Sequence, residues 1–291
     1  MNDLLAPLQN PALGYSIAGS GEAVVLLHSS LSHKGQWSAL AQNLAATHRV
    51  IAIDLLGHGD ASDASAASLD DEARRIETIL HKAVGRIPPF QAVGHSYGGG
   101  VALRLARNLP DRVISLALYE PTAFHVLPED DIARAEVELV VDIMHSALQR
   151  GIPAAAAEIF IDYWAGIGAY RALPPHRQAM FTAKVKTALS HFGALFNEPA
   201  NLGDYAQLTM PVCLIVGDSS PASSRRVAEH LSRTFACCER QRVEAGHMGP
   251  ITHPEAINPI IERFIENVAA CPAPWWPIES NNRVSRNALA A

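Results

Sequence analysis

A serine between two glycines, Gly94-x-Ser96-x-Gly98, stands directly after a short apolar run and before a segment with helical spacing. A G-x-S-x-G segment between a strand and a helix is typical of a sharp turn that presents a serine hydroxyl as a nucleophile. Small flanking residues are needed because a Cβ there would collide with the neighbouring strand and helix. The segment therefore predicts nucleophilic catalysis by Ser96, and the alternative is a tight turn whose serine is only structural.

Short apolar runs that alternate with helical patterns predict the elements that position this serine. Continuous apolar runs suit buried parallel strands. They lie at residues 23–27, 50–53, 90–93, 113–119 and 212–216, and a further short strand is expected near 240–243. Between two of them, Ser68 and Asp71 form a capping box that begins a helix, and Gly85 ends it. The alternation predicts the α/β class, with a mostly parallel, doubly wound sheet.

Residues 121–209 interrupt this alternation with patterns that are almost wholly helical. Pro128-Glu129-Asp130-Asp131 is expected to begin the first of these helices, with the acids in its first turn. Prolines begin two more helices, one at Pro153 and one at Pro174-Pro175. We therefore expect a helical insertion of a different character from the rest of the chain.

The domain interpretation follows from these boundaries. Residues 1–120 and 210–271 form one α/β core, and residues 121–209 form the helical insertion. Residues 272–291 contain three prolines and no apolar period, which predicts an irregular tail.

Composition limits the classes of function. Hydrophobic residues make up 48% of the 291 residues, which supplies a sizeable core, and the net charge of −6 gives no basic excess for nucleic acid. The four cysteines suggest neither a disulfide framework nor a zinc site, and neither HExxH nor GxxxxGK[ST] occurs. The chain has no signal-peptide pattern and no apolar stretch that could span a bilayer, so we expect a cytoplasmic protein without metal, cofactor or membrane.

Four segments together resemble the α/β-hydrolase family, over about residues 12 to 270. They are Leu27-His28-Ser29-Ser30, Asp54-Leu55-Leu56-Gly57-His58-Gly59, Gly94-His95-Ser96-Tyr97-Gly98-Gly99 and Ala245-Gly246-His247-Met248. The resemblance implies the α/β-hydrolase fold with the insertion as a lid, similar to esterases and lipases that use a serine nucleophile. One departure is visible, since the family usually has His-Gly where this chain has His28-Ser29.

A serine nucleophile needs a base, and the chain has 13 histidines to choose from. Triads in this fold follow the chain order serine, acid, histidine. That order favours His247, in the loop between the last strand and the last helix, over His253, which directly precedes Pro254 and has a simpler place at a helix start.

Two carboxylates compete for the acid. The family usually places its acid three residues after the glycine that closes the strand, and here that residue is Ser220. Asp218 is only one residue past Gly217 and could instead cap the next helix. Some family members carry the acid after the preceding strand, where this chain has Glu120. We favour Glu120, because a carboxylate at the end of a buried strand is costly unless it is paired; Asp218 stays the alternative.

The resemblance implies an oxyanion hole of two backbone N–H groups, from Tyr97 after the nucleophile and from Ser30 in the loop after the first apolar run. Candidate substrate contacts lie around this loop and in the insertion: His28, Ser29, Trp37 and Trp164. Aromatic residues of the insertion such as Trp164 are also typical of plain core packing.

The sequence thus predicts a serine hydrolase that cleaves an ester or a related acyl bond of a small molecule through an acyl-enzyme. It needs no cofactor. Serine rather than aspartate as the nucleophile argues against dehalogenase and epoxide-hydrolase chemistry. The alternatives are a cofactor-free lyase or oxygenase and a non-catalytic binding protein, because one fold supports many functions.

Overall fold

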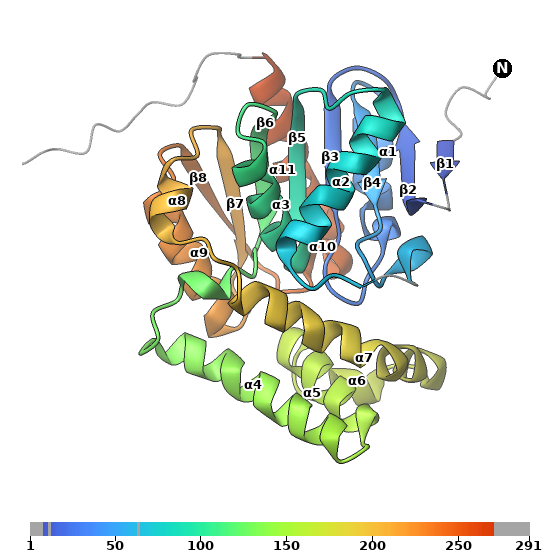
Figure 1. Cartoon of the computed structure of the whole chain (residues 1–291), viewed down its shortest axis with the longest axis vertical. Helices are drawn as coiled ribbons and strands as arrows, with labels where there is room; N and C mark the ends of the chain where they lie inside the picture. The colour runs from blue at the N-terminus through green and yellow to red at the C-terminus, as the bar shows by residue number, and fades with distance from the viewer. Residues whose placement is uncertain (1–7, 11–12, 63–64, 271–291) are drawn as a thin grey trace, which may run out of the picture.

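The computed structural model describes residues 8–10, 13–62 and 65–270 (Figure 1). Its described part contains an eight-stranded sheet in the order β1-β2-β4-β3-β5-β6-β7-β8. The strands are β1 (Leu8–Asn10), β2 (Tyr15–Ala18), β3 (Ala23–Leu27), β4 (Arg49–Ile53), β5 (Phe90–His95), β6 (Val113–Tyr119), β7 (Val212–Gly217) and β8 (Cys238–Val243). All neighbours from β4 to β8 pair in parallel, whereas β1 with β2 and β2 with β4 pair antiparallel. The mostly parallel α/β architecture expected from the apolar runs is confirmed.

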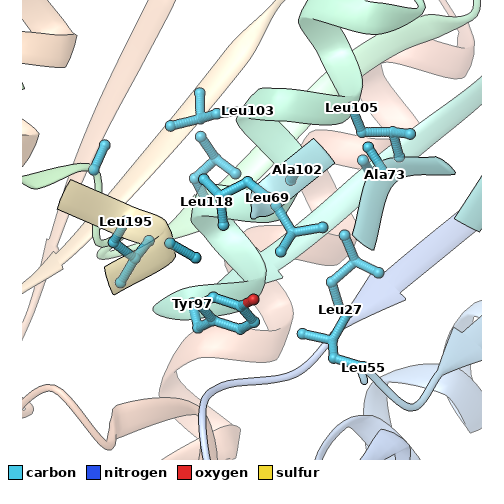
Figure 2. Close-up of a cluster of buried hydrophobic side chains, with 14 of the residues drawn as sticks. Leu27, Leu55, Leu69, Ala73, Tyr97, Ala102, Leu103, Leu105, Leu118 and Leu195 are labelled. Carbon is cyan, nitrogen blue, oxygen red and sulfur yellow. The ribbon is translucent and has the colours of Figure 1, made fainter. Parts of the chain in front are cut away.

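Helices cover both faces of this sheet, as a doubly wound fold requires. They are α1 (Ser38–Leu44), α2 (Leu69–Val84), α3 (Tyr97–Asn108), α9 (Ala222–Thr234), α10 (Gly249–Thr252) and α11 (Pro254–Ala270), with 3₁₀ turns η2 (Lys34–Trp37) and η3 (Gly59–Ala61). One buried apolar cluster packs α2, α3 and α9 on the sheet, and a second packs α1 and α11 on its other face. Figure 2 shows part of the first cluster, which includes Leu69 and Ala73 of α2 and Leu27 and Leu118 of the strands.

The helical insertion lies at one end of the sheet (Figure 1). It consists of η4 (Phe124–Val126), α4 (Ile132–Gln149), α5 (Pro153–Ala165), α6 (Ala169–Ala172), α7 (Pro175–Phe196) and α8 (Leu202–Ala206). The buried Glu198 carboxylate forms ion pairs with the guanidinium groups of Arg104 and Arg107 of α3, each at 2.9 Å. Arg226 of α9 pairs with the Asp131 carboxylate at 2.8 Å. These ion pairs attach both ends of the insertion to the core.

The structure corrects some expectations about individual elements. The acids at 129–131 precede the first helix of the insertion instead of filling its first turn, because Asp131 is the N-cap and accepts the Ala133 N–H at 2.9 Å. The antiparallel pair β1–β2 and the short helices α6, α8 and α10 were not predicted. The predicted irregular tail, residues 272–291, lies outside the described residues. Across the described ranges, no helix has the length and apolar character needed to cross a bilayer.

The predicted capping box is present at the start of α2. The Ser68 hydroxyl accepts the Asp71 N–H at 3.2 Å, and an Asp71 carboxylate oxygen accepts the Ser68 N–H at 3.0 Å. We expect Ser68→Ala to lower the free energy of unfolding by about 1 kcal/mol, because one N-terminal N–H of the helix loses its acceptor. Thermal unfolding should show a melting temperature about 2–4 °C lower. Ser68→Asp retains an acceptor and should match the wild type; equal losses in both variants would contradict this role for the cap.

Candidate active site

Ser96 occupies a strained turn between β5 and α3. Its backbone has φ 54° and ψ −118°, a conformation that a residue with a Cβ rarely adopts. The turn brings α3 so close to the sheet that a Cβ on Gly94 would lie 2.6 Å from the carbonyl oxygen of Gly98. A Cβ on Gly98 would overlap the backbone carbonyls of Leu27 and His28. The glycines of the motif are therefore required by packing, and the turn holds the serine at the end of the strand.

Ser96, His247 and Glu120 form one buried chain of hydrogen bonds. The Ser96 Oγ lies 2.9 Å from His247 Nε2, and His247 Nδ1 lies 2.7 Å from Glu120 Oε2. The other carboxylate oxygen of Glu120 accepts the N–H of Gly217 at 2.7 Å. A carboxylate at Nδ1 fixes the tautomer in which Nδ1 donates, so Nε2 is left to accept the serine proton. This is the geometry that an activated serine needs.

The alternative acid, Asp218, does not reach this histidine. Its carboxylate is partly exposed and accepts from the guanidinium of Arg242 on β8 at 2.5 and 2.8 Å. The structure thus brings Glu120, and not Asp218, to His247. Ser220, at the position where the family usually has its acid, is buried and makes no side-chain hydrogen bond in the described part of the chain.

A further serine approaches the histidine from α9. Ser224 is fully buried, and its hydroxyl lies 3.3 Å from His247 Nδ1, on the side that also faces Glu120. In the sequence nothing distinguishes Ser224 from its neighbours Ser220 and Ser223, so no signal pointed to it.

Gln36 of η2 connects the loop after β3 to the nucleophile turn. Its Oε1 accepts from the Ser29 N–H at 3.1 Å and from the Ser29 hydroxyl at 2.9 Å. Its Nε2 donates to His95 Nδ1 at 3.1 Å, and His95 Nε2 in turn donates to the backbone carbonyl of His247 at 2.8 Å. Gln36 also explains how a serine replaces the family's glycine at position 29, because the amide accepts the extra hydroxyl. No motif in the sequence points to Gln36.

Two buried histidines hold the loop that carries Ser30. His28 donates from Nδ1 to the Ser29 carbonyl at 2.7 Å and accepts the Leu55 N–H at Nε2 at 2.9 Å. His58 donates to the Leu56 carbonyl and accepts the Leu31 N–H, both at 2.9 Å. Each ring must be neutral for its Nε2 to accept. Burial agrees with this, since it lowers the pKa of His28 to about 3 and that of His58 to about 4.

Two backbone N–H groups face no acceptor in this region. The Ser30 and Tyr97 N–H groups make no hydrogen bond to any described residue. Tyr97 is the first residue of α3, where N–H groups have no partner within the helix. His191 of α7 closes this side of the site, because its Nδ1 lies 2.8 Å from the Ser30 hydroxyl and its ring stacks on Tyr97 at 3.7 Å.

A cavity of about 650 Å³ adjoins these groups, between the sheet end and the insertion. Ser96, His247, Ser30 and Tyr97 all line it. The apolar part of its wall is formed mainly by Phe124, Phe160, Trp164, Phe181, Phe192 and Leu195. Trp164 also stacks directly on the His247 ring, with 4.0 Å between ring centroids.

The four candidate substrate contacts divide into two pairs. Ser29 and Trp164 line the cavity, whereas His28 and Trp37 do not. His28 is fully buried, and both of its ring nitrogens form hydrogen bonds with backbone groups. Trp37 is buried in the apolar cluster that packs α1 and α11 on the sheet. Loop support and core packing therefore account for His28 and Trp37.

Comparison with known proteins identifies the family of the chain. Residues 24–260 match the model of the alpha/beta hydrolase family, and the chain belongs to that family. The solved structure of a hydrolase from Oleispira antarctica superposes with a TM-score of 0.70 at 18% identity, covering 87% of this chain and 94% of that one.

The relatives in sequence include a lipase and an esterase. Lipase LipV of Mycobacterium tuberculosis is 29% identical over 83% of this chain and 93% of its own. The pimeloyl-[acyl-carrier protein] methyl ester esterase of Nitrosomonas europaea is 36% identical over 112 residues, 38% of this chain. That second match spans less than half of the esterase, 42% of its length.

The Gln36 network generates a stability test. We expect Gln36→Ala to lower the free energy of unfolding by about 1–3 kcal/mol, because it leaves buried groups of Ser29 and His95 without a partner. Urea or thermal unfolding measures the change. The matched control is Asn43→Ala, which removes an exposed amide that bonds Glu262 and should change the stability by less than about 0.5 kcal/mol. Similar values for the two variants would show that Gln36 does not hold the loops together.

Proposed function

We propose that the protein is a serine esterase that cleaves a small acyl ester through a covalent acyl-enzyme. The observation that carries the proposal is the buried chain from Ser96 Oγ through His247 to Glu120. The named activities of the two sequence relatives, an esterase and a lipase, support the same reaction class.

The proposed mechanism follows from these contacts. His247 Nε2 takes the proton of Ser96 as Oγ attacks the ester carbonyl, and Glu120 stabilises the imidazolium that forms. The carbonyl oxygen becomes an oxyanion, which the N–H groups of Ser30 and Tyr97 receive. The imidazolium then protonates the departing alcohol, and the Ser96 acyl ester remains.

The second half of the cycle uses the same groups. Water gives a proton to His247 and attacks the acyl ester, and a second oxyanion forms at the same N–H pair. Its collapse releases the carboxylic acid and returns the proton to Ser96. No cofactor enters either step.

We propose that the helical insertion, residues 121–209, is the lid domain of this site, over the core formed by residues 1–120 and 210–271. Trp164 and His191 come from the insertion and contact His247 and Tyr97 directly. The insertion therefore supplies part of the wall against which substrate packs, and it keeps bulk water from the catalytic imidazole.

Ser96→Ala is the direct test of the nucleophile. We expect hydrolysis of a short-chain p-nitrophenyl ester to fall by more than about 10⁴-fold, because only the oxyanion donors and binding remain. The melting temperature should not change, since alanine keeps the Cβ that the turn accommodates. Ser146→Ala, at an exposed serine of α4, serves as the control and should keep full activity. Residual activity of more than a few per cent in Ser96→Ala would favour the lyase, oxygenase or binding alternatives.

The acid is tested by a pair of variants. Glu120→Gln should lower kcat by about 10³–10⁴-fold, because the amide keeps the shape but cannot stabilise an imidazolium. Asp218→Asn should stay near wild type, since Asp218 only pairs with exposed Arg242. Steady-state kinetics on the same ester measures both. The reverse pattern would assign the acid to Asp218, and two near-normal variants would exclude a triad.

A further inference from the structure

One face of α7 runs along the cavity from its mouth to the N–H pair. The cavity side chains on this helix include Arg177, Phe181, Lys184, Ala188 and His191, which are three or four residues apart and so share a face. His191 marks the inner end, because it contacts both Ser30 and Tyr97. At 1.5 Å per residue, the Lys184 backbone lies roughly 10 Å along the axis from His191, and that of Arg177 roughly 21 Å.

The charge of the cavity wall has one sign. Lys184 and Arg177 are basic, and no aspartate or glutamate of the described residues lines the cavity. Neither cation forms an ion pair with a carboxylate in the described part of the chain, and Arg177 packs over the Phe181 ring instead, 5.4 Å from its centroid. Glu120 lies behind His247, fully buried and outside the wall.

The lysine is the better placed of the two cations. Lys184 is half-buried, while Arg177 is exposed at the mouth. Burial lowers the pKa of His58, and the Lys184 charge adds to this effect, so the ammonium is close enough to act on the His58 ring. A half-buried ammonium without a counter-ion gains more from an anion than a surface lysine does, because water screens the pair less. The whole chain carries a net charge of −6, so any attraction for an anion arises locally.

We propose that the ester bound in this cavity carries an anionic group, a carboxylate or a phosphate, and that Lys184 binds it with Arg177 at the cavity mouth. The anionic group then lies on the order of 10 Å from the reacting carbonyl, because about 10 Å of α7 separates the Lys184 backbone from that of His191. The aromatic wall that includes Phe160 and Phe192 packs against the methylene groups that separate the anionic group from the ester carbonyl. The inference rests on the proposed function, because it takes Ser96 as the place where the carbonyl binds.

Matched substrates provide the first experiment. Mono-4-nitrophenyl esters of hexanedioic and octanedioic acid end in a carboxylate, and the same compounds with a terminal carboxamide are neutral at equal length. We expect kcat/KM to be about tenfold higher for the acid-ended esters, mainly through a lower KM, since a charged hydrogen bond contributes about this much. The preference should fall with added salt. Equal rates for the two series, or a preference for the amides, would overturn the inference.

Two lysines of α7 provide the matched variants. Lys184→Met keeps the length of the stem and removes the charge, and it should reduce the preference for acid-ended esters about tenfold. Lys186→Met alters an exposed lysine two residues along the helix, outside this cavity wall, and should leave the preference unchanged. An equal effect of both variants, or none from Lys184→Met, would contradict the assignment.

A binding measurement separates this inference from the esterase proposal. Calorimetric titration of the Ser96→Ala protein with octanedioate and with 7-phosphonoheptanoate requires no turnover, and comparing the two ligands distinguishes a carboxylate from a phosphate-type anion. We expect binding of at least one to weaken about tenfold when Lys184→Met is added. If neither ester is hydrolysed but this binding depends on Lys184, the anion site stands and the esterase proposal fails. If Ser96-dependent hydrolysis occurs and neither ligand's binding depends on Lys184, the anion site is wrong.

Discussion

The strained turn at Ser96 is the constraint on which the site depends. Within the described chain, three residues other than glycine have positive φ: Leu31 (58°), Ser96 (54°) and Glu120 (44°). They follow β3, β5 and β6, which are neighbours in the sheet. Such conformations cost about 1–3 kcal/mol each and persist only where the surrounding packing enforces them. The strained residues therefore lie at the carboxyl ends of three neighbouring strands. There they orient the loop that carries Ser30, the Ser96 hydroxyl and the Glu120 carboxylate toward a common point.

The hydrogen bonds around this point fix the tautomers of three other histidines. His28, His58 and His95 each donate from one ring nitrogen and accept at the other, so their tautomers are fixed. Burial lowers the pKa of each, and the rings stay neutral. Because none can change charge near neutral pH, they act as rigid braces for the loops. The imidazole of His247 differs, since it has a serine at one nitrogen and a carboxylate at the other.

Local patterns in the sequence were enough to predict the sheet and two members of the hydrogen-bonded chain. Apolar runs predicted the five strands β3 to β7 closely, because a buried parallel strand must be apolar on both faces. The antiparallel pair β1–β2 was missed, since its strands are only three and four residues long and mix polar with apolar residues.

Local sequence patterns alone do not decide which carboxylate lies beside His247. Glu120 and Asp218 both follow strands, and only the three-dimensional placement of β6 beside β7 brings Glu120 within reach of His247. Gln36 and Ser224 gave no signal, because their importance lies in partners distant in the sequence.

The helical insertion covers two ring faces of the site that the α/β core alone would leave exposed to water. The core provides the serine, the histidine and the carboxylate, but one face of the imidazole and the ring of Tyr97 would be open to water. Trp164 covers the first at 4.0 Å and His191 covers the second at 3.7 Å. Trp164 therefore excludes water from one face of the His247 ring. Since Glu198 and Asp131 attach the insertion to α3 and α9 at its two ends, this cover is a fixed part of the site.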